Sequence, residues 1–447
     1  MCDILDILNK KRFAKSLSDD EIHFFVKGVT DKTIPDYQIS ALLMAITLNG
    51  MSDQEMTALT LEMAASGEIC DLSVIPGIKV DKHSTGGVGD KCTPVLLALL
   101  AACDATVVKL SGRGLGFTGG TIDKLESIQE FQTQIPIADF PRYVQRAGVV
   151  LSGQTPELAP ADKVLYALRD VTATVQSIPL IASSIMSKKI AGGADAIVLD
   201  VTYGSGAFMK TIDDARALAQ AMIKIGKIAG KPVICVLTPM KQPLGYAIGN
   251  VLEMEEAWQI IQGKGPPDAV DICITLAACM LFLSELSQDS FQLETYKERL
   301  LKHLNSSRPA ECFQKFIRSQ GGLLDTDGNP AYTEIPVEID VLSAECDGYI
   351  SNLDALLIGE ASMLLGAGRR SKTDSLDPGA GIVLEKKAGD PVKKGEILLR
   401  FYKGDRANLS KEKIFQAKNK CIQAFSISQN QPEKNQDTIE IISDFTK

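Results

Sequence analysis

The sequence lacks the patterns that mark a metal-binding or a disulfide-stabilised protein. Its 10 cysteines form no CxxC pair and have no histidine at zinc-finger spacing. A chain of 447 residues is long enough to form its own cores without disulfide bonds. We therefore expect reduced thiols, most of them packed in the core, and a cytoplasmic protein.

The chain also lacks a basic stripe, a membrane-spanning run and a targeting segment. Its net charge is −9, with both signs scattered along its length, which argues against a nucleic-acid partner. The longest apolar run, 272–283, is too short to cross a bilayer and predicts a buried helix. Residues 1–13 mix acidic side chains with short apolar stretches, unlike a signal or transit peptide. We expect neither a membrane nor a nucleic acid among its partners.

What is present predicts an α/β fold that begins with helices. Residues 1–66 have apolar side chains at helical spacing and capping boxes at Ser18 with Glu21 and at Ser52 with Glu55. Beyond Pro76, glycine-rich turns and β-rich segments alternate with helical stretches, which predicts a mostly parallel sheet. The β-rich segments are 106–110, 148–151, 196–201 and 232–237, and 213–229 is a helical one.

From about Ile335 the pattern changes to short alternating strands and turns, which predicts a C-terminal α+β domain with antiparallel strands. We interpret that domain as a structural cap. The expected division is a helical domain at 1–66 and 160–192, an α/β domain at 67–159 and 193–334, and the α+β domain at 335–447.

Two glycine-rich loops are the first candidates for chemistry. Val80–Lys91 reads VDKHSTGGVGDK, a strand that runs into glycines whose N–H groups can turn toward an anion. Taken alone, such a turn is more often structural. The second loop, SGRGLGFTGGT at 111–121, has Gly114, Gly116 and Gly119 in GxGxxG spacing. Its density of glycine and hydroxyl residues fits a second phosphate loop better than a dinucleotide turn.

A third candidate is the segment 166–189, YALRDVTATVQSIPLIASSIMSKK. Ser184 and Lys188 are four residues apart, so a helix would place them on one face, within reach of one heteroaromatic ring. The alternative is an amphipathic helix with a solvated lysine, and Arg169 would then be an ordinary surface ion-pair residue.

These strings, together with DVTYGSGAFMKT at 200–211 and LLGAGRRSK at 364–372, resemble the thymidine and pyrimidine-nucleoside phosphorylases, and most closely the pyrimidine-nucleoside branch. The resemblance covers nearly the whole chain. It implies a pentosyltransferase with phosphate as co-substrate and no organic cofactor. Uridine, thymidine and deoxyuridine would be split into the base and an α-D-ribose or deoxyribose 1-phosphate, with inversion through an oxocarbenium-like transition state.

The resemblance also implies site residues. The catalytic set is His83, Arg169 and Lys188, and Arg169, Ser184 and Lys188 bind the nucleoside. Family members are homodimers that pair through the helical domain and close by a hinge motion. Phosphate is held by Lys82, Ser84, Thr93, Lys109, Ser111 and Thr121.

Three positions separate this chain from the family pattern, and a fourth indicates the branch. Lys109 is typical of the broader branch, whereas thymidine-selective members tend to have Met. Phe117 stands where the family usually has His, beside the sugar and base, and Thr202 replaces a usual Lys. Some members bind potassium where this chain has Lys91 in place of Thr, and we hypothesise that the Lys91 ammonium pairs with Glu256 and stands in for the ion. The matching potassium positions are Gly89, Lys91, Leu244, Ala247 and Glu256.

Two alternatives stay open at this point. A catalytically weak nucleoside-binding paralogue would fit the changes at Phe117 and Thr202. A related phosphoribosyltransferase shares the architecture but needs magnesium and acidic pairs near the loops, and the sequence gives no clear pair.

Overall fold

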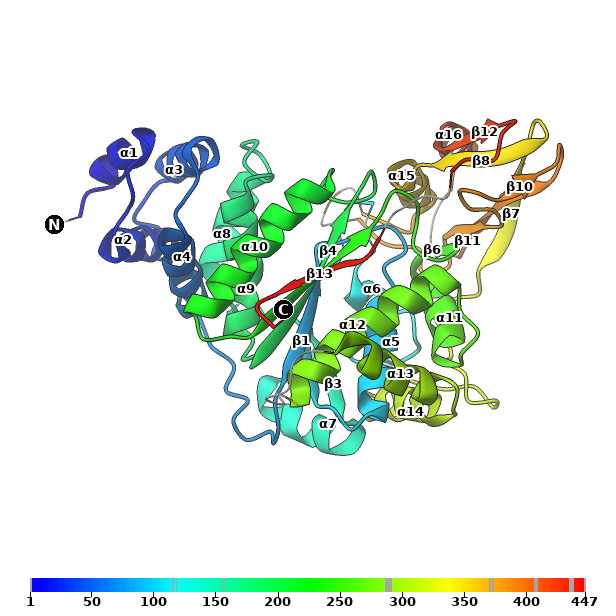
Figure 1. The fold of residues 1–447 in the computed structure, drawn as a ribbon, viewed down its shortest axis with the longest axis horizontal. Coiled ribbons are helices and arrows are strands. Elements are labelled where there is room, and N and C mark those ends of the chain that lie inside the picture. Colours follow the sequence, from blue (N-terminus) through cyan, green and yellow to red (C-terminus); the bar gives the residue numbers. More distant parts are fainter. Residues whose placement is uncertain are drawn as a thin grey trace.

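The structure is a computed structural model that describes residues 2–445, except 115, 118, 156, 286–291, 370, 372–373, 406–408 and 434–437. A helical end, a central α/β part and a C-terminal α+β part follow one another along its longest axis (Figure 1). This architecture confirms the predicted fold class.

The helical end is formed by helices distant in the sequence. Both predicted capping boxes are present, and each satisfies two N–H groups that a helix start leaves free. A fully enclosed ion pair between Lys11 and Glu55, at 2.8 Å, joins α1 to α4. Helices α8 and α9 pack on α2, α3 and α4. The six helices are α1 (Ile4–Arg12), α2 (Asp19–Thr30), α3 (Asp36–Asn49), α4 (Asp53–Ala65), α8 (Pro160–Arg169) and α9 (Ile178–Ala191).

The central sheet has the order β1-β4-β5-β13. Its first three strands are parallel, and β4 and β5 are mostly apolar on both faces, because helices cover each side. A parallel pair, β2 with β3, lies beside β1. The strands are β1 (Val80–Ser84), β2 (Val107–Ser111), β3 (Val149–Gly153), β4 (Ala196–Tyr203), β5 (Val233–Pro239) and β13 (Glu440–Ser443).

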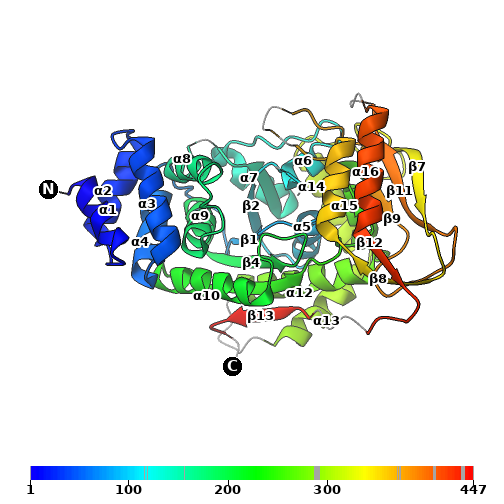
Figure 2. The ribbon, with the colours of Figure 1, turned by 90° about the horizontal axis from the view of Figure 1, so that it is seen from above.

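Helices wrap this sheet, as Figure 2 shows for α10 and α12. In the described part of the chain, α12 alone is long and apolar enough to cross a membrane, and 72% of its most apolar window is buried. It is a core helix, as the run 272–283 predicts. The covering helices are α5 (Cys92–Ala102), α6 (Thr121–Leu125), η1 (Ile137–Asp139), α7 (Phe140–Ala147), α10 (Ile212–Ile228), α11 (Asn250–Ile261), α12 (Pro267–Glu285), α13 (Leu293–Leu304) and α14 (Arg308–Ser319).

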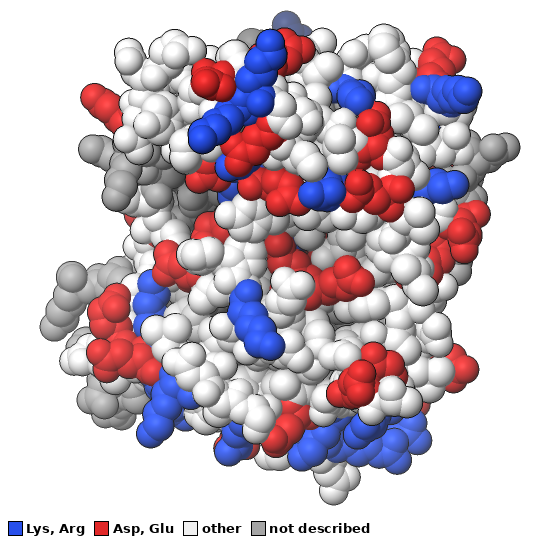
Figure 3. All heavy atoms as spheres, turned by 90° about the vertical axis from the view of Figure 1, so that its right-hand side faces the viewer, with Lys and Arg blue, Asp and Glu red and all other residues white. Residues whose placement is uncertain are grey.

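The C-terminal part contains two antiparallel sheets, and antiparallel strands are what the sequence predicts there. Two strand pairs connect this end of the chain to the α/β part. Strand β6 pairs with β9, and β13 returns to pair with β5. Acidic and basic side chains are interspersed over the face in Figure 3. The elements are β6 (Ala247–Ile248), β7 (Val337–Ser343), β8 (Gly348–Leu353), α15 (Ala355–Leu365), β9 (Gly381–Leu384), β10 (Pro391–Val392), β11 (Ile397–Lys403), α16 (Lys411–Ala424) and β12 (Phe425–Ser428).

Candidate active site

Strand β1 carries four polar residues in a row at its carboxyl end, and its alternation divides them between two faces of the sheet. On one face, the ammonium of Lys82 lies 3.1 Å from Asp200 and 3.7 Å from Asp90. Burial disfavours its charge, but the two carboxylates outweigh burial and raise the pKa of Lys82. Lys82 is therefore charged and is neutralised by two acidic groups.

The opposite face of β1 has an excess of positive charge. Asp81 lies 2.6 Å from the ammonium of Lys189 and 3.5 Å from that of Lys109, and both ammoniums donate to the carbonyl of Leu110 at 3.1 Å. Two cations thus share one carboxylate. Burial, together with the nearby Lys189, lowers the pKa of Lys109 to about 7, although Asp81 acts in the opposite sense.

His83 projects from the same face of β1 as Asp81. Burial first, then the charges of Lys189, Lys109, Lys188 and Lys82, lower the pKa of His83 well below its usual value. The imidazole is neutral at neutral pH. An anion placed among these lysines would oppose their effect and favour the imidazolium.

The two glycine loops meet at one buried lysine. The ammonium of Lys124 donates to the carbonyl of Asp90 at 2.6 Å, in the first loop, and to that of Gly119 at 3.3 Å, in the second. It also pairs with Glu253 at 2.8 Å. Gly89 has a φ of +80°, and a Cβ there would lie 2.5 Å from the carbonyl oxygen of Leu244, so the turn requires glycine. The loops are held against each other.

The expected phosphate residues occupy the starts and ends of elements around these loops. The Gly86 N–H donates to the Ser84 hydroxyl at 3.2 Å, and that hydroxyl bonds Asp90. Thr93 lies in the first turn of α5, Ser111 ends β2 and Thr121 begins α6.

The expected base-binding residues lie on α8 and α9. Lys188 donates to the Ser184 hydroxyl at 2.9 Å and to Asp162 at 2.5 Å, so the helical spacing does bring the serine and lysine together. Arg169 is not the surface ion-pair residue of the alternative interpretation, because it is 2% exposed. Its guanidinium donates to the carbonyls of Thr174, Val175 and Leu180 at 2.7–3.3 Å. It supports the segment that leads into α9.

Two of the unusual residues make internal contacts. The Thr202 hydroxyl bonds the Thr85 hydroxyl at 2.9 Å and the carbonyl of Gly86, which ties β4 to the first loop. Phe117 packs toward α15, where a Cβ built on Gly359 would lie 3.3 Å from the Cβ of Phe117.

Lys91 contacts the residues that match the family's potassium positions. Its ammonium, fully buried, donates to the carbonyls of Leu244 at 2.8 Å and Ala247 at 2.9 Å and forms a very short ion pair with Glu256. Glu256 and other acidic groups raise the pKa of Lys91 despite its burial. An ammonium stands where an additional cation would have to bind, so these residues do not fit a potassium ion.

Sequence reasoning missed Asp81, Asp162, Lys189 and Asp200. A signal existed for Asp200, a charged residue inside the apolar strand β4, but its partner Lys82 is more than 100 residues away. Asp90 and Asp200 also form an acidic pair beside the first loop, which the sequence did not reveal. With Cys92 they could group around a metal ion, but the ammonium of Lys82 lies 3.1 Å from Asp200 and 3.7 Å from Asp90. A cation of the chain already stands beside both carboxylates, which disfavours the magnesium site of a phosphoribosyltransferase.

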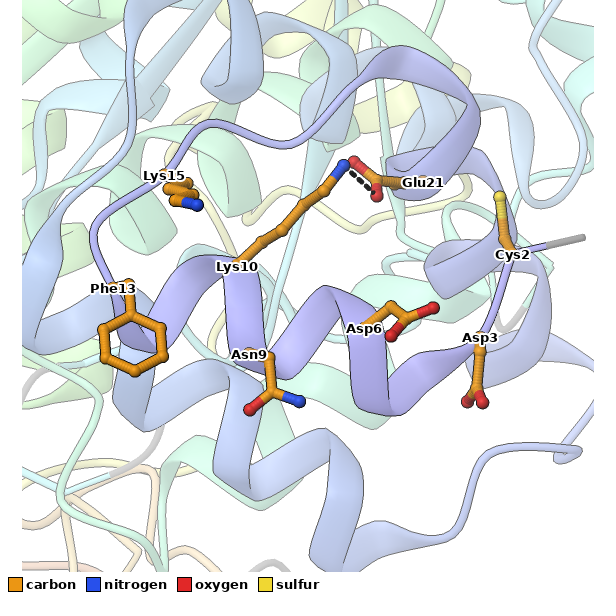
Figure 4. Close-up of a pocket in the computed structure, with 8 residues that line it drawn as sticks. All are labelled: Cys2, Asp3, Asp6, Asn9, Lys10, Phe13, Lys15 and Glu21. Atoms are coloured by element: carbon orange, nitrogen blue, oxygen red, sulfur yellow. Dashed lines mark hydrogen bonds and ion pairs between the residues drawn. The ribbon is translucent and has the colours of Figure 1, made fainter.

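A hollow of about 410 Å³ lies at the far helical end of the molecule (Figure 4). Its lining mixes both charges, and Lys10 pairs there with Glu21 at 2.6 Å. It contains none of the expected site residues.

Three family profiles match the chain. They are the a/b domain of a glycosyl transferase family at residues 77–306, the helical bundle domain of a glycosyl transferase family at 5–67, and a pyrimidine nucleoside phosphorylase C-terminal domain at 349–423. The structure also resembles the crystal structure of anthranilate phosphoribosyltransferase from Thermus thermophilus. The TM-score is 0.56 at 14% identity, over 70% of this chain and 98% of that one, which shows a shared fold alone.

Curated relatives are much more similar. A pyrimidine-nucleoside phosphorylase of Staphylococcus epidermidis is 51% identical over 402 residues, 89% of this chain and 92% of that protein. The Bacillus subtilis protein of the same name is 51% identical over 89% and 92%. That of Geobacillus stearothermophilus is 48% identical over 92% and 95%.

The pKa of Lys109 predicts how phosphate affinity changes with pH. Above pH 7 free Lys109 loses its proton, so phosphate has to bind together with a proton and its affinity falls with rising pH. Replacing Lys109 with Met should remove the contribution of Lys109 and weaken this dependence, whereas Lys227→Met, at a side chain that is 73% exposed, should leave it intact. Calorimetric titration with inorganic phosphate from pH 6 to 9 measures both profiles. The second ionisation of phosphate affects all three proteins alike, so identical profiles for wild type and Lys109→Met would disprove the assignment.

Proposed function

The chain belongs to the pyrimidine-nucleoside phosphorylase family, and from that membership we propose that it cleaves pyrimidine nucleosides with inorganic phosphate. As a pentosyltransferase it would release the free base and an α-D-ribose or deoxyribose 1-phosphate. We expect it to accept uridine, thymidine and deoxyuridine, with thymidine phosphorylase as the near alternative. We also propose that it works in the cytoplasm, where its cysteines, free in this structure, stay reduced.

The observation that best supports this function is the sharing of Asp81 by Lys109 and Lys189 beside the glycine loops. One carboxylate balances only one of the two ammoniums, and excess positive charge in a buried site favours an anionic ligand. We propose that Lys109 supplies most of the charge that phosphate meets, because Lys82 is already neutralised. Hydroxyl and N–H groups of Ser84, Thr93, Ser111 and Thr121 complete the phosphate site.

Phosphate bound at the lysines would also change the protonation of His83, the proposed general acid. A dianion offsets the charges that keep His83 neutral, so His83 gains the proton that it can pass to the leaving base. Phosphate attacks the anomeric carbon opposite the base while positive charge develops on the sugar. Lys188 and Ser184 hold the base, and Arg169 reaches it by exchanging one of its three carbonyl contacts.

We propose that the chain closes around its substrates by a hinge motion between two units. The helical unit (1–66 and 160–192) carries the base-binding residues, and the α/β unit (67–159 and 193–334) carries the phosphate loops, with 335–447 behind them. Closure would bring phosphate to the sugar. It would also exclude water, which would otherwise react with the oxocarbenium-like sugar.

A second copy of the chain is the proposed partner of α3. Tyr37, Met44 and Leu48 are 73%, 36% and 75% exposed, and they lie on one side of this helix at intervals of seven and four residues. Exposed apolar stripes of this kind are covered in protein interfaces. The homodimer would pair through the helical unit.

We propose that no potassium ion serves this protein, since Lys91 supplies a cation that is part of the chain. Its ammonium connects the first glycine loop to the segment Leu244–Ala247 and to α11. The loop geometry would then be independent of the ions in solution.

The proposed activity predicts base release that requires phosphate. Incubation with uridine, thymidine and deoxyuridine, with and without phosphate, should give free base only when phosphate is present, as measured by chromatography. Lys188→Met should slow release at least about 100-fold, because a charged donor to the base is lost. Base release without phosphate would indicate a hydrolase. Absence of release from all three nucleosides would indicate a nucleoside-binding paralogue.

The α3 stripe predicts a dimer that one substitution disrupts. Leu48→Glu should convert a dimer to a monomer in analytical ultracentrifugation, because it places a charge in the apolar stripe of each copy. The control Ile335→Glu changes a residue that is 82% exposed on the opposite part of the molecule, and it should remain dimeric. A wild-type monomer, or a dimer that survives Leu48→Glu, contradicts the proposal.

The Lys91 proposal predicts equal turnover of the wild type in potassium and sodium buffers. Lys91→Thr removes the ammonium and leaves buried Glu256 unpaired, which should lower the free energy of unfolding by roughly 3–5 kcal/mol. Potassium should restore both thermal stability and turnover by binding the vacated carbonyls. Lys91→Met fills the space without charge, so no ion should rescue it. Strong potassium dependence of the wild type would overturn the proposal.

A further inference from the structure

The second glycine loop has little in its own sequence to fix its shape. Residues 112–120 include Gly112, Gly114, Gly116, Gly119 and Gly120, and ordering glycine costs more conformational entropy than ordering any other residue. Gly116 adopts a φ of +76°. The contacts that stabilise this conformation must therefore come from outside the loop.

Arg369, from the segment that follows α15, supplies several of these contacts. Its guanidinium lies 2.8 Å from Asp123 and donates to the carbonyl of Gly114 at 3.3 Å. Asp123 in turn accepts the Gly114 N–H at 2.8 Å. Arg369 and Asp123 thus bind both polar groups of Gly114, and their side chains are only 14% and 2% exposed.

The main chain and one aromatic ring reinforce this contact. The Gly116 N–H donates to the Arg369 carbonyl at 2.8 Å. A Cβ at Gly368 would lie 2.6 Å from the Gly116 carbonyl oxygen, so the two backbones approach as closely as glycine allows. Phe117 packs beside Gly359 of α15. The change from the family's usual histidine thus places an apolar side chain against the C-terminal part.

The segment that carries Arg369 is itself fixed. Asn250, at the start of α11, donates to the Ala367 carbonyl at 3.2 Å, and the N–H of Asp377 donates to the Gly366 carbonyl at 3.0 Å. The guanidinium also donates to the Asp374 carbonyl at 3.3 Å. Arg369 therefore connects the loop to the segment that follows α15, which Asn250 of α11 also contacts.

We propose that Arg369 is a positioning residue for phosphate, acting through Asp123 to hold the second glycine loop in its binding shape. The proposal rests on the phosphorolytic function above. It makes the C-terminal part of the chain a component of the phosphate site, in addition to the cap that the sequence indicates.

The test compares Arg369→Ala with Arg400→Ala. Arg400 also lies in the C-terminal part and pairs with Glu338 at 3.0 Å and Glu385 at 2.7 Å. Neither partner belongs to the glycine loops, so its removal should change kinetic constants less than about twofold. Arg369→Ala should raise the KM for phosphate about 10-fold or more, with the KM for uridine within about twofold. Arg369→Lys should give an intermediate KM for phosphate, because one ammonium replaces the planar guanidinium that bonds both Asp123 and the Gly114 carbonyl.

Two further measurements separate positioning from a general loss of structure. Millimolar guanidinium chloride should lower the phosphate KM of Arg369→Ala and leave that of wild type unchanged. Calorimetric titration with inorganic phosphate should show the same loss of affinity without any turnover, so the result stands even if the proposed reaction is wrong. A drop in thermal stability with an unchanged phosphate KM, or an equal effect of Arg400→Ala, would overturn the inference.

Discussion

The contact of Asp81 with both Lys109 and Lys189 is the interaction on which the site depends. Buried charges are costly unless paired, and here one carboxylate serves two ammoniums. The protein tolerates this imbalance by lowering the pKa of Lys109 and keeping His83 neutral. The free site is therefore less charged than its residue types suggest, and it reaches its full charge only with an anion present.

Much of the fold was predictable, because it follows from local patterns. Both capping boxes, the parallel strands and the buried helix near 272–283 come from periodicity and turn residues, and the structure confirms each. The predicted strand 196–201 matches β4 (Ala196–Tyr203) apart from its last two residues. Helix spacing was also enough to bring Ser184 to Lys188.

Most of the electrostatic partners were not predictable from the sequence. Lys189 bonds Asp81 across 108 positions. The pair of Lys91 with Glu256, across 165 positions, was expected only from the family resemblance. Such pairs depend on which strands become neighbours, and no local pattern encodes that. Arg169 shows the same limit in another form. Its residue type did not reveal that three backbone carbonyls accept its hydrogen bonds in this structure.

The residues that distinguish this chain from its family have a common consequence. Thr202 ties the first loop to β4, and Lys91 ties it to the segment before α11. Phe117, in the second loop, packs beside α15 of the C-terminal part. Lys124 joins the two loops to each other. The loops are thus supported by β4, by α11 and by the region of α15. The remaining side faces α8 and α9, which carry Lys188 and Ser184. If the molecule closes on its substrates, these helices have to move toward loops that are already fixed.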